Sequence, residues 1–280
     1  MFLGNVIFDE RKKQGLTQTE LAAGICNQNI ISRLEKHDAM PTLTVLLQLC
    51  LKLNLTLNDV FSDFASNANV EEHAVLVDLE RDILLGQVGN VTAKFALITE
   101  SQLKDNDQII YTFLKGFLVI QSDPDTALFT MDKVLMLTQN DTYDIYTELA
   151  YLVKAKVYMT KQDLRRAGDY YGLIMQALQA NLLISNAKSS ELLFILKDIA
   201  AFYFASKDQV TTIKVSNRGI KLAQSKHVTY FVEYLYFYKV SCLTSTAPDF
   251  ENQCRVGIAM ATANGNNRIR QAIQSLLPRG

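Results

Sequence analysis

Apolar residues recur at helical spacing along almost the whole chain, and few residues interrupt them. The 280 residues include only four prolines and twelve glycines. Residues that break helices are therefore rare, and the alternation typical of strands is almost absent. We predict an all-α protein whose long helices are joined by short connections.

The first part of the chain, residues 1–66, has more closely spaced signals for the ends and starts of helices than the rest. Gly15 and Gly24 each end a short apolar pattern, and Pro41 opens another. Thr17 is followed three residues later by Glu20, which is the spacing of a capping box at the start of a helix. These signals predict a compact N-terminal domain of five short helices.

Two of these helices have the pattern of a helix-turn-helix, within residues 16–35. Apolar side chains hold the two helices together, and polar side chains cover the opposite face of the second one. The apolar set is Leu21, Ile25, Ile31 and Leu34, and the polar set is Gln28, Asn29, Ser32 and Arg33.

A polar face of this kind suits the major groove of DNA. Gln28 and Asn29 lie near the helix start and have side chains that can pair with adenine, and Arg33 has the fork that pairs with guanine. Gln18 is expected to contact a phosphate, as is Lys36. Thr17 is first a helix cap and only second a DNA contact.

Plainer interpretations exist for several of these residues. Arg11 and Glu35 are suited to an internal ion pair between the first helix and the recognition helix, and Arg11 would then not touch DNA. Arg33 could be a solvated surface charge. The whole segment could also be a small helical packing unit with no role in DNA binding.

The second part of the chain, residues 70–280, has the pattern of stacked helix pairs. Asp123, Asp163, Asp208 and Asp249 recur at steps of about 40 residues, each just before the second helix of a pair. Pro124 and Pro248 are expected in first turns. The predicted pairs are 70–86 with 91–104, 107–122 with 124–138, 142–160 with 163–180, 188–206 with 209–225, and 228–245 with 248–263, followed by a last helix at 266–277.

The third pair carries the small and aromatic residues of a tetratricopeptide repeat. Ala155 and Ala167 would let its two helices approach closely. The period and this pattern predict a helical-hairpin solenoid of the tetratricopeptide type.

The residues quoted above resemble a known family. The first 64 residues resemble the Cro/CI-type (XRE-type) helix-turn-helix of phage repressors. Residues 24–35 are similar to the variant found in Rgg/PlcR-type (RRNPP) regulators of Gram-positive bacteria, which respond to peptide pheromones. The resemblance implies one DNA-binding domain followed by a repeat domain that dimerises and binds a short reimported peptide.

In such a domain the peptide would lie on the concave face, built by the first helices of successive pairs. The repeat register directs Thr112, Lys156, Lys197 and Tyr238 toward that face. Each of these four side chains could instead be solvated or packed against its neighbours.

Composition narrows the classes of function. The net charge of −1 provides no general attraction to nucleic acid, so DNA binding would need a small surface doubled by dimerisation on a palindromic operator. Four scattered cysteines and three scattered histidines predict no metal, disulfide framework or cofactor. No long apolar run and no signal-like start are found, and so we expect a cytoplasmic protein that does not bind membranes.

No catalytic motif is found, so the chain is predicted not to be an enzyme. The sequence favours a dimeric, sequence-specific transcription regulator controlled by a signalling peptide. Two alternatives stay open: a helical-repeat module for protein interactions, and a regulator of the same type without a peptide ligand.

Overall fold

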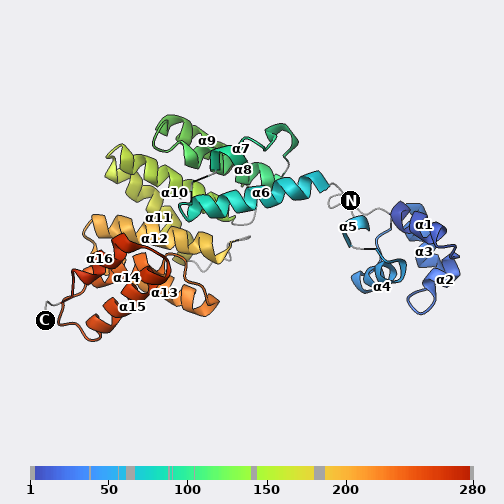
Figure 1. Cartoon of the computed structure of the whole chain (residues 1–280). Coiled ribbons are helices and arrows are strands. Elements are labelled where there is room, and N and C mark those ends of the chain that lie inside the picture. Colours follow the sequence, from blue (N-terminus) through green and yellow to red (C-terminus); the bar gives the residue numbers. More distant parts are fainter. Residues whose placement is uncertain are drawn as a thin grey trace. The chain divides into compact units, whose positions relative to one another are not determined.

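The structure, a computed structural model, is helical throughout its regular elements (Figure 1). It describes residues 4–37, 39–55, 57–60, 67–87, 89, 91–103, 105–139, 144–179 and 187–277. The all-α class predicted from the sequence is confirmed. The chain divides into two compact units, Met1–Val75 and Leu76–Gly280.

In the described residues of the N-terminal unit, five short helices precede a longer one. They are α1 (Gly4–Lys13), α2 (Gln18–Ala22), α3 (Gln28–His37), α4 (Leu43–Leu53) and α5 (Leu57–Val60). The end of the fifth predicted helix, residues 61–64, lies outside the described residues.

Local signals set the ends of these helices. Thr17 and Glu20 form the predicted capping box at the start of α2. Gly15 and Gly24 have φ angles of 72° and 80°, a left-handed conformation that glycine adopts without steric cost. Asn54 has a similar conformation and ends α4. These turns bring one apolar face of each helix into a shared core.

That core consists of buried residues that are each at most 3% exposed. It includes both helices of the predicted helix-turn-helix and residues of α1, α4 and α5 that cover them. Its buried members are Ile7, Leu21, Ala22, Ile31, Leu34, Leu46, Leu49, Cys50, Leu53 and Val60.

The C-terminal unit is built from the end of α6 (Asn67–Leu84) and the helices that follow. They are α7 (Val91–Phe95), the 3-10 turn η1 (Glu100–Gln102), α8 (Asp105–Leu118), α9 (Pro124–Leu137), α10 (Ile145–Thr160), α11 (Leu164–Gln179), α12 (Ser189–Ala205), α13 (Gln209–Lys226), α14 (Val232–Ser241), α15 (Phe250–Ala263) and α16 (Asn267–Gln274).

The helices from α8 onward stack in two layers. Helices α8, α10, α12, α14 and α16 each contact the next member of this series, and they form one layer. Helices α9, α11, α13 and α15 pack against them as the second helices of successive pairs. This is the predicted stacking of helix hairpins, and Ala155 and Ala167 are fully buried where α10 meets α11.

The recurring aspartates cap helices at three of the four predicted places. Asp123, Asp163 and Asp208 each accept a hydrogen bond of 3.0 Å from a backbone N–H three residues later. Asp249 differs, because its φ is 65° and its side chain makes no capping hydrogen bond to α15. The prediction that Pro248 lies in a first turn was wrong, since α15 begins at Phe250.

The predicted single helix over 91–104 was also wrong. The structure has the short α7, then a turn, then η1, because the chain bends to bury Ile98 and Leu103. Thr99 between them is extended. The free energy gained by burying these two apolar side chains is greater here than the free energy that a continuous helix would contribute.

No helix in the described part of the chain is long and apolar enough to cross a membrane.

Glu148 on α10 is an ionisable group that the fold removes from water. It is 1% exposed, and its Oε2 has no hydrogen-bond partner among the described residues. Burial raises the pKa of Glu148 from 4.5 to about 7. Because the folded pKa is the higher one, this group's contribution to stability is present at low pH and is lost as the pH rises through that interval.

We therefore predict that Glu148→Gln flattens the pH dependence of unfolding of the C-terminal unit. The Glu148 carboxyl should lower the wild-type free energy of unfolding by about 3 kcal/mol at most between pH 4.5 and 8, and the variant should lack this part of the fall. Urea unfolding at several pH values measures it, with the exposed Glu251→Gln as the control. Equal slopes for all three proteins would contradict the prediction.

Candidate nucleic-acid interface and ligand clefts

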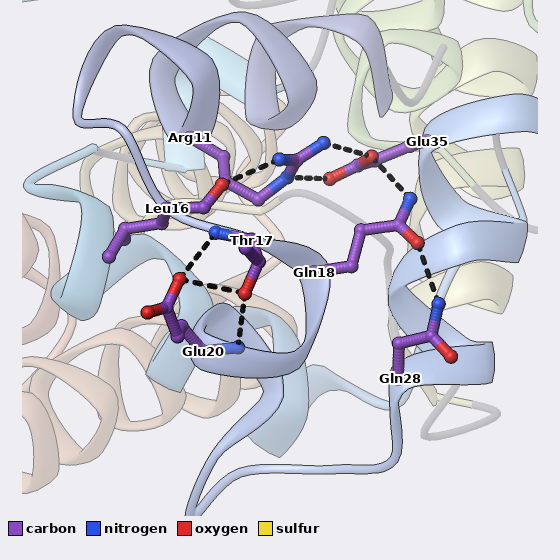
Figure 2. Close-up of polar contacts among 7 residues, drawn as sticks. All are labelled: Arg11, Leu16, Thr17, Gln18, Glu20, Gln28 and Glu35. Atoms are coloured by element: carbon purple, nitrogen blue, oxygen red, sulfur yellow. Dashed lines mark hydrogen bonds and ion pairs between the residues drawn. The ribbon is translucent and has the colours of Figure 1, made fainter.

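Helix α2 is fixed at its start by reciprocal hydrogen bonds (Figure 2). The backbone N–H of Glu20 donates to Thr17 Oγ1 at 3.2 Å, and the backbone N–H of Thr17 donates to Glu20 Oε2 at 2.7 Å. At the other end, Lys52 Nζ donates to the carbonyl oxygens of Glu20 and Ala23 at 2.7 and 3.1 Å. Both ends of this short helix are thereby held.

Helix α3 is tied to α1 by the ion pair that the sequence suggested. Arg11 donates from Nε to Glu35 Oε1 at 2.6 Å and from its second guanidinium nitrogen to Oε2 at 2.8 Å. A third hydrogen bond of 2.7 Å goes to the carbonyl oxygen of Leu16. The side chains of Arg11 and Glu35 are only 4% and 2% exposed, so Arg11 is occupied inside the domain.

Glu35 is kept ionised by its partners. Burial acts to raise the pKa of this carboxyl, but the hydrogen bonds from Arg11 and Gln18 outweigh burial and lower the pKa below its ordinary value. A buried charge pair of this geometry fixes the angle between α1 and α3.

Gln18 joins this pair to the start of the recognition helix. Its Nε2 donates to Glu35 Oε2 at 2.9 Å, and its Oε1 accepts from Gln28 Nε2 at 2.9 Å (Figure 2). A chain of hydrogen bonds therefore runs from Arg11 through Glu35 and Gln18 to Gln28. This series of hydrogen bonds was not predicted, since the spacing of the four residues in the sequence carries no signal for it.

The outer face of α3 carries the polar ridge that the sequence predicted. Gln28, Asn29, Arg33 and Lys36 are exposed and Ser32 is half-buried, while Ile31 and Leu34 on the opposite face are fully buried. Thr17 is exposed at the start of α2, and Gln18 is half-buried. These residues thus form one surface of a rigid scaffold.

A second group of predicted residues comes together in the C-terminal unit. Lys156 on α10 and Lys197 on α12 both contact Asp198, at 3.0 Å to Oδ2 and 3.3 Å to Oδ1. Burial acts to raise the pKa of Asp198, and the two lysines lower it overall. Burial, together with the charge of Asp198, raises the pKa of Tyr238 to about 12. Asp198, which organises this group, was not singled out from the sequence.

Thr112, the fourth predicted ligand residue, is used within its own helix. It is 9% exposed, and its hydroxyl donates to the carbonyl oxygen of Gln108 at 2.6 Å.

Aromatic rings surround the ammonium group of Lys197. Its Nζ lies 4.3 Å from the ring centre of Phe194, 4.9 Å from that of Phe231 and 5.7 Å from that of Tyr234. Contact with ring faces stabilises a cation removed from water. Burial nevertheless lowers the pKa of Lys197.

Lys197 lines a cleft of about 680 Å³, here called the larger cleft. Glu233, Tyr234, Asn264 and Asn266 also line it. The carboxylate of Glu233 is 4% exposed and accepts hydrogen bonds of 2.8 Å from Asn264 and 3.2 Å from Asn266. The two asparagines were not predicted, because they lie in the turn between α15 and α16 and not on a helix face.

A smaller cleft of about 340 Å³ adjoins the larger one, and both are lined by Leu84 and Tyr230. Glu80, Arg81 and Lys188 contribute its charged groups. The volume of each cleft lies in the range of sites that hold small molecules.

Comparisons with known proteins agree with this architecture. Residues 7–60 match the helix-turn-helix family, so the N-terminal unit contains a helix-turn-helix domain. No curated protein matches the chain.

Solved structures match nearly the whole chain. The structure of PlcR from Bacillus thuringiensis in complex with the peptide PapR7 and DNA has a TM-score of 0.69 at 16% identity, with 96% of this chain and 98% of that chain covered. The apo form of the same protein has a TM-score of 0.59 at 14% identity, covering 97% and 99%. The structure of ComR from S. thermophilus in complex with DNA and its signalling peptide ComS has a TM-score of 0.53 at 14% identity, with 97% of each chain covered. At these identities the likeness shows a shared fold.

The ion pair behind α3 leads to a stability prediction. Glu35→Gln leaves the Arg11 guanidinium buried without a counter-charge, which should destabilise the N-terminal unit by about 3 kcal/mol. Hydrogen exchange of amides in α1 and α3 measures this loss. Glu10→Gln is the matched control, because Glu10 forms an exposed pair with Lys13 at 3.1 Å and its loss should change little. Similar exchange in the two variants would contradict the prediction.

Proposed function

We propose that this chain is a transcription regulator of the PlcR type, which recognises DNA through α3 and is controlled by a short peptide bound in its C-terminal unit. One observation carries the DNA-binding part: an exposed polar ridge on α3 is held by a buried ion pair and a chain of hydrogen bonds. The fold shared with PlcR and ComR, which were solved with DNA and peptides, supports both parts.

Gln28 is the residue that the structure prepares most completely for base recognition. One N–H of its amide is engaged by Gln18, which sets the orientation of the group. Its oxygen and second N–H remain on the exposed edge, and adenine offers the complementary acceptor and donor in the major groove. We assign adenine recognition to Gln28 and Asn29, and guanine recognition to Arg33, which is exposed further along the ridge.

The remaining residues of the surface are assigned to the DNA backbone. Lys36, Ser32 and Thr17 would contact phosphates, Thr17 in addition to its role as a cap. Gln18 has a second N–H for a phosphate, and it also orients Gln28. A net charge of −1 gives no general attraction to DNA, so we propose that a homodimer binds two half-sites of a palindromic operator.

In the C-terminal unit we assign the peptide to the two adjoining clefts. Of the predicted ligand residues, Lys197 lines the larger cleft. Lys156 and Tyr238 line neither cleft, and we assign them to the site because both interact with Asp198, the ion-pair partner of Lys197. We assign Thr112 a role in packing and not in peptide binding, because its hydroxyl donates a hydrogen bond within α8. The proposal includes no catalytic activity and no cofactor, and it places the protein in the cytoplasm, where its DNA lies.

The DNA assignment predicts distinct effects for two substitutions. Gln28→Ala should weaken binding to the preferred site by about 1–3 kcal/mol and relax the preference at one base pair. Arg33→Ala should do the same at another base pair. Selection from random DNA duplexes followed by affinity measurements tests this, with the exposed Gln48→Ala on α4 as the matched control.

Gln18→Ala should lower affinity for all sequences and, because it frees Gln28, also blunt the adenine preference. If Gln28→Ala and Arg33→Ala bind the selected site as tightly as Gln48→Ala does, the recognition helix is misassigned. A chain that selects no DNA sequence at all would instead favour the alternative of a helical-repeat interaction module.

The ligand assignment predicts that a short peptide accompanies the protein purified from its host. Native mass spectrometry should detect the mass of the bound peptide. The Lys197→Met variant should purify without the peptide, because the substitution removes an ammonium group that can bind a ligand carboxylate. Lys214→Met, at an exposed position of α13, is the control. Absence of any bound peptide from cultures at all growth phases would favour a regulator without a peptide ligand.

A further inference from the structure

Glu80 anchors the end of α6 to two other helices. Its carboxylate is 2% exposed; Oε1 accepts a hydrogen bond of 2.7 Å from the Tyr146 hydroxyl on α10, and Oε2 one of 2.6 Å from Lys188 Nζ, directly before α12. These contacts join residues 66 and 108 positions apart in the sequence. No residue of this group was singled out from the sequence.

Glu191 is a second buried carboxyl group that pairs with Lys188. Its side chain is 1% exposed, and its Oε1 lies 3.2 Å from Lys188 Nζ. Burial and the nearby charge of Glu80 raise the pKa of Glu191 to about 7. Two buried carboxyl groups thus share one ammonium group, and removal of that ammonium would leave them facing each other without a counter-charge.

Lys188 is also the member of the cluster that a ligand can reach. Its side chain is 43% exposed and lines the smaller cleft, whereas the carboxylates of Glu80 and Glu191 lie behind it. Arg81, at 54% exposed, lines the same cleft and also pairs with Asp78 at 3.1 Å and with Asp82 at 3.5 Å. Lys197 lines the adjoining cleft, 3.3 Å from Asp198. The acidic residues that line the clefts, Glu80 and Glu233, are buried and hydrogen-bonded. The charges offered to a ligand are therefore cationic.

We propose that the two clefts form one site for an acidic peptide, and that a carboxylate of this peptide binds Lys188 and draws it away from Glu80, which loosens the end of α6. This proposal rests on the proposed control by a peptide and specifies its chemistry and its point of action. Lys188 has three N–H donors but a single charge, so a ligand carboxylate competes with Glu80 and Glu191 for it.

The helix affected is the one that continues into the DNA-binding unit. Helix α6 begins at Asn67, and the division between the units falls within it, after Val75. Leu76, Leu79 and Ile83 remain buried and keep α6 in place, so loss of the Glu80 contact changes how firmly α6 is held and does not unfold it. A ligand that binds Lys188 more strongly when α6 is loosened than when it is held would favour the loosened state. Such a difference in affinity is what couples the peptide site to the DNA-binding unit.

The anchor is tested first without ligand, in the full chain. Lys188→Met should increase the hydrogen-exchange rate of amides in residues 76–84 by about tenfold. Lys94→Met is the matched control, because Lys94 forms an ion pair of 2.9 Å with Asp82 on the same helix but lines neither cleft. The double variant Glu80→Gln with Lys188→Met should return exchange toward the wild-type rate, since it removes one of the two uncompensated carboxylates and with it their mutual repulsion. Equal rates in Lys188→Met and Lys94→Met would overturn the anchor.

The ligand class is tested with a library of random heptapeptides selected on the full chain. Selected peptides should be rich in Asp and Glu, and a selected peptide remade with Asn and Gln should bind at least about tenfold more weakly. The acidic peptide should also speed exchange in residues 76–84 of the wild type and not further in Lys188→Met. Selection of neutral or basic peptides, or of none, overturns the proposal.

These outcomes separate the two levels of inference. If the chain selects an operator but its peptides are not acidic, the further inference fails and the DNA-binding function stands. If acidic peptides bind and loosen α6 but no DNA is selected, the DNA-binding function fails and the site stands.

Discussion

Each unit of this protein depends on a carboxylate that is removed from water and balanced by a cation from another helix. Glu35 is balanced by Arg11 of α1, and Glu80 by Lys188 at the start of α12. Asp198 is balanced by Lys156 of α10, together with Lys197 of its own helix. Such pairs contribute little net stability, but breaking one is costly, so they hold helices at defined positions. The apolar core brings the helices together, and these pairs determine which arrangement is compatible with buried charge.

The buried ion pairs at the two proposed sites, behind α3 and at the end of α6, differ in their exposure to solvent. At α3 the pair is closed, because Arg11 and Glu35 are both buried, and its effect is to present a rigid ridge to a partner. At α6 the pair is open on one side, because Lys188 is partly exposed beside a cleft. A closed pair suits recognition of a fixed shape such as a DNA groove, while an open pair suits a site that must respond to a ligand.

Much of the fold and of the candidate DNA-binding surface could be predicted because the signals are local. A capping box, a glycine turn and apolar spacing act within one or two helical turns, and they located α1 to α4 and the ridge from Gln28 to Arg33. The Arg11–Glu35 pair could be suggested from residue type alone. The prediction failed at residues 91–104, where burial of Ile98 and Leu103 competes with continued helix formation. It also failed at Asp249, which has a left-handed backbone conformation and makes no capping hydrogen bond.

The sequence by itself therefore determined the helical class, the helix-turn-helix and the stacked pairs, since helix formation and amphipathic patterning are properties of neighbouring residues. Only the tertiary structure decided that Gln18 orients Gln28, that Asp198 gathers two lysines, and that Glu80 meets Tyr146 and Lys188 across 66 and 108 residues. Such contacts depend on how whole helices stack, and a buried charge in one helix leaves no periodic trace in the sequence of its partner.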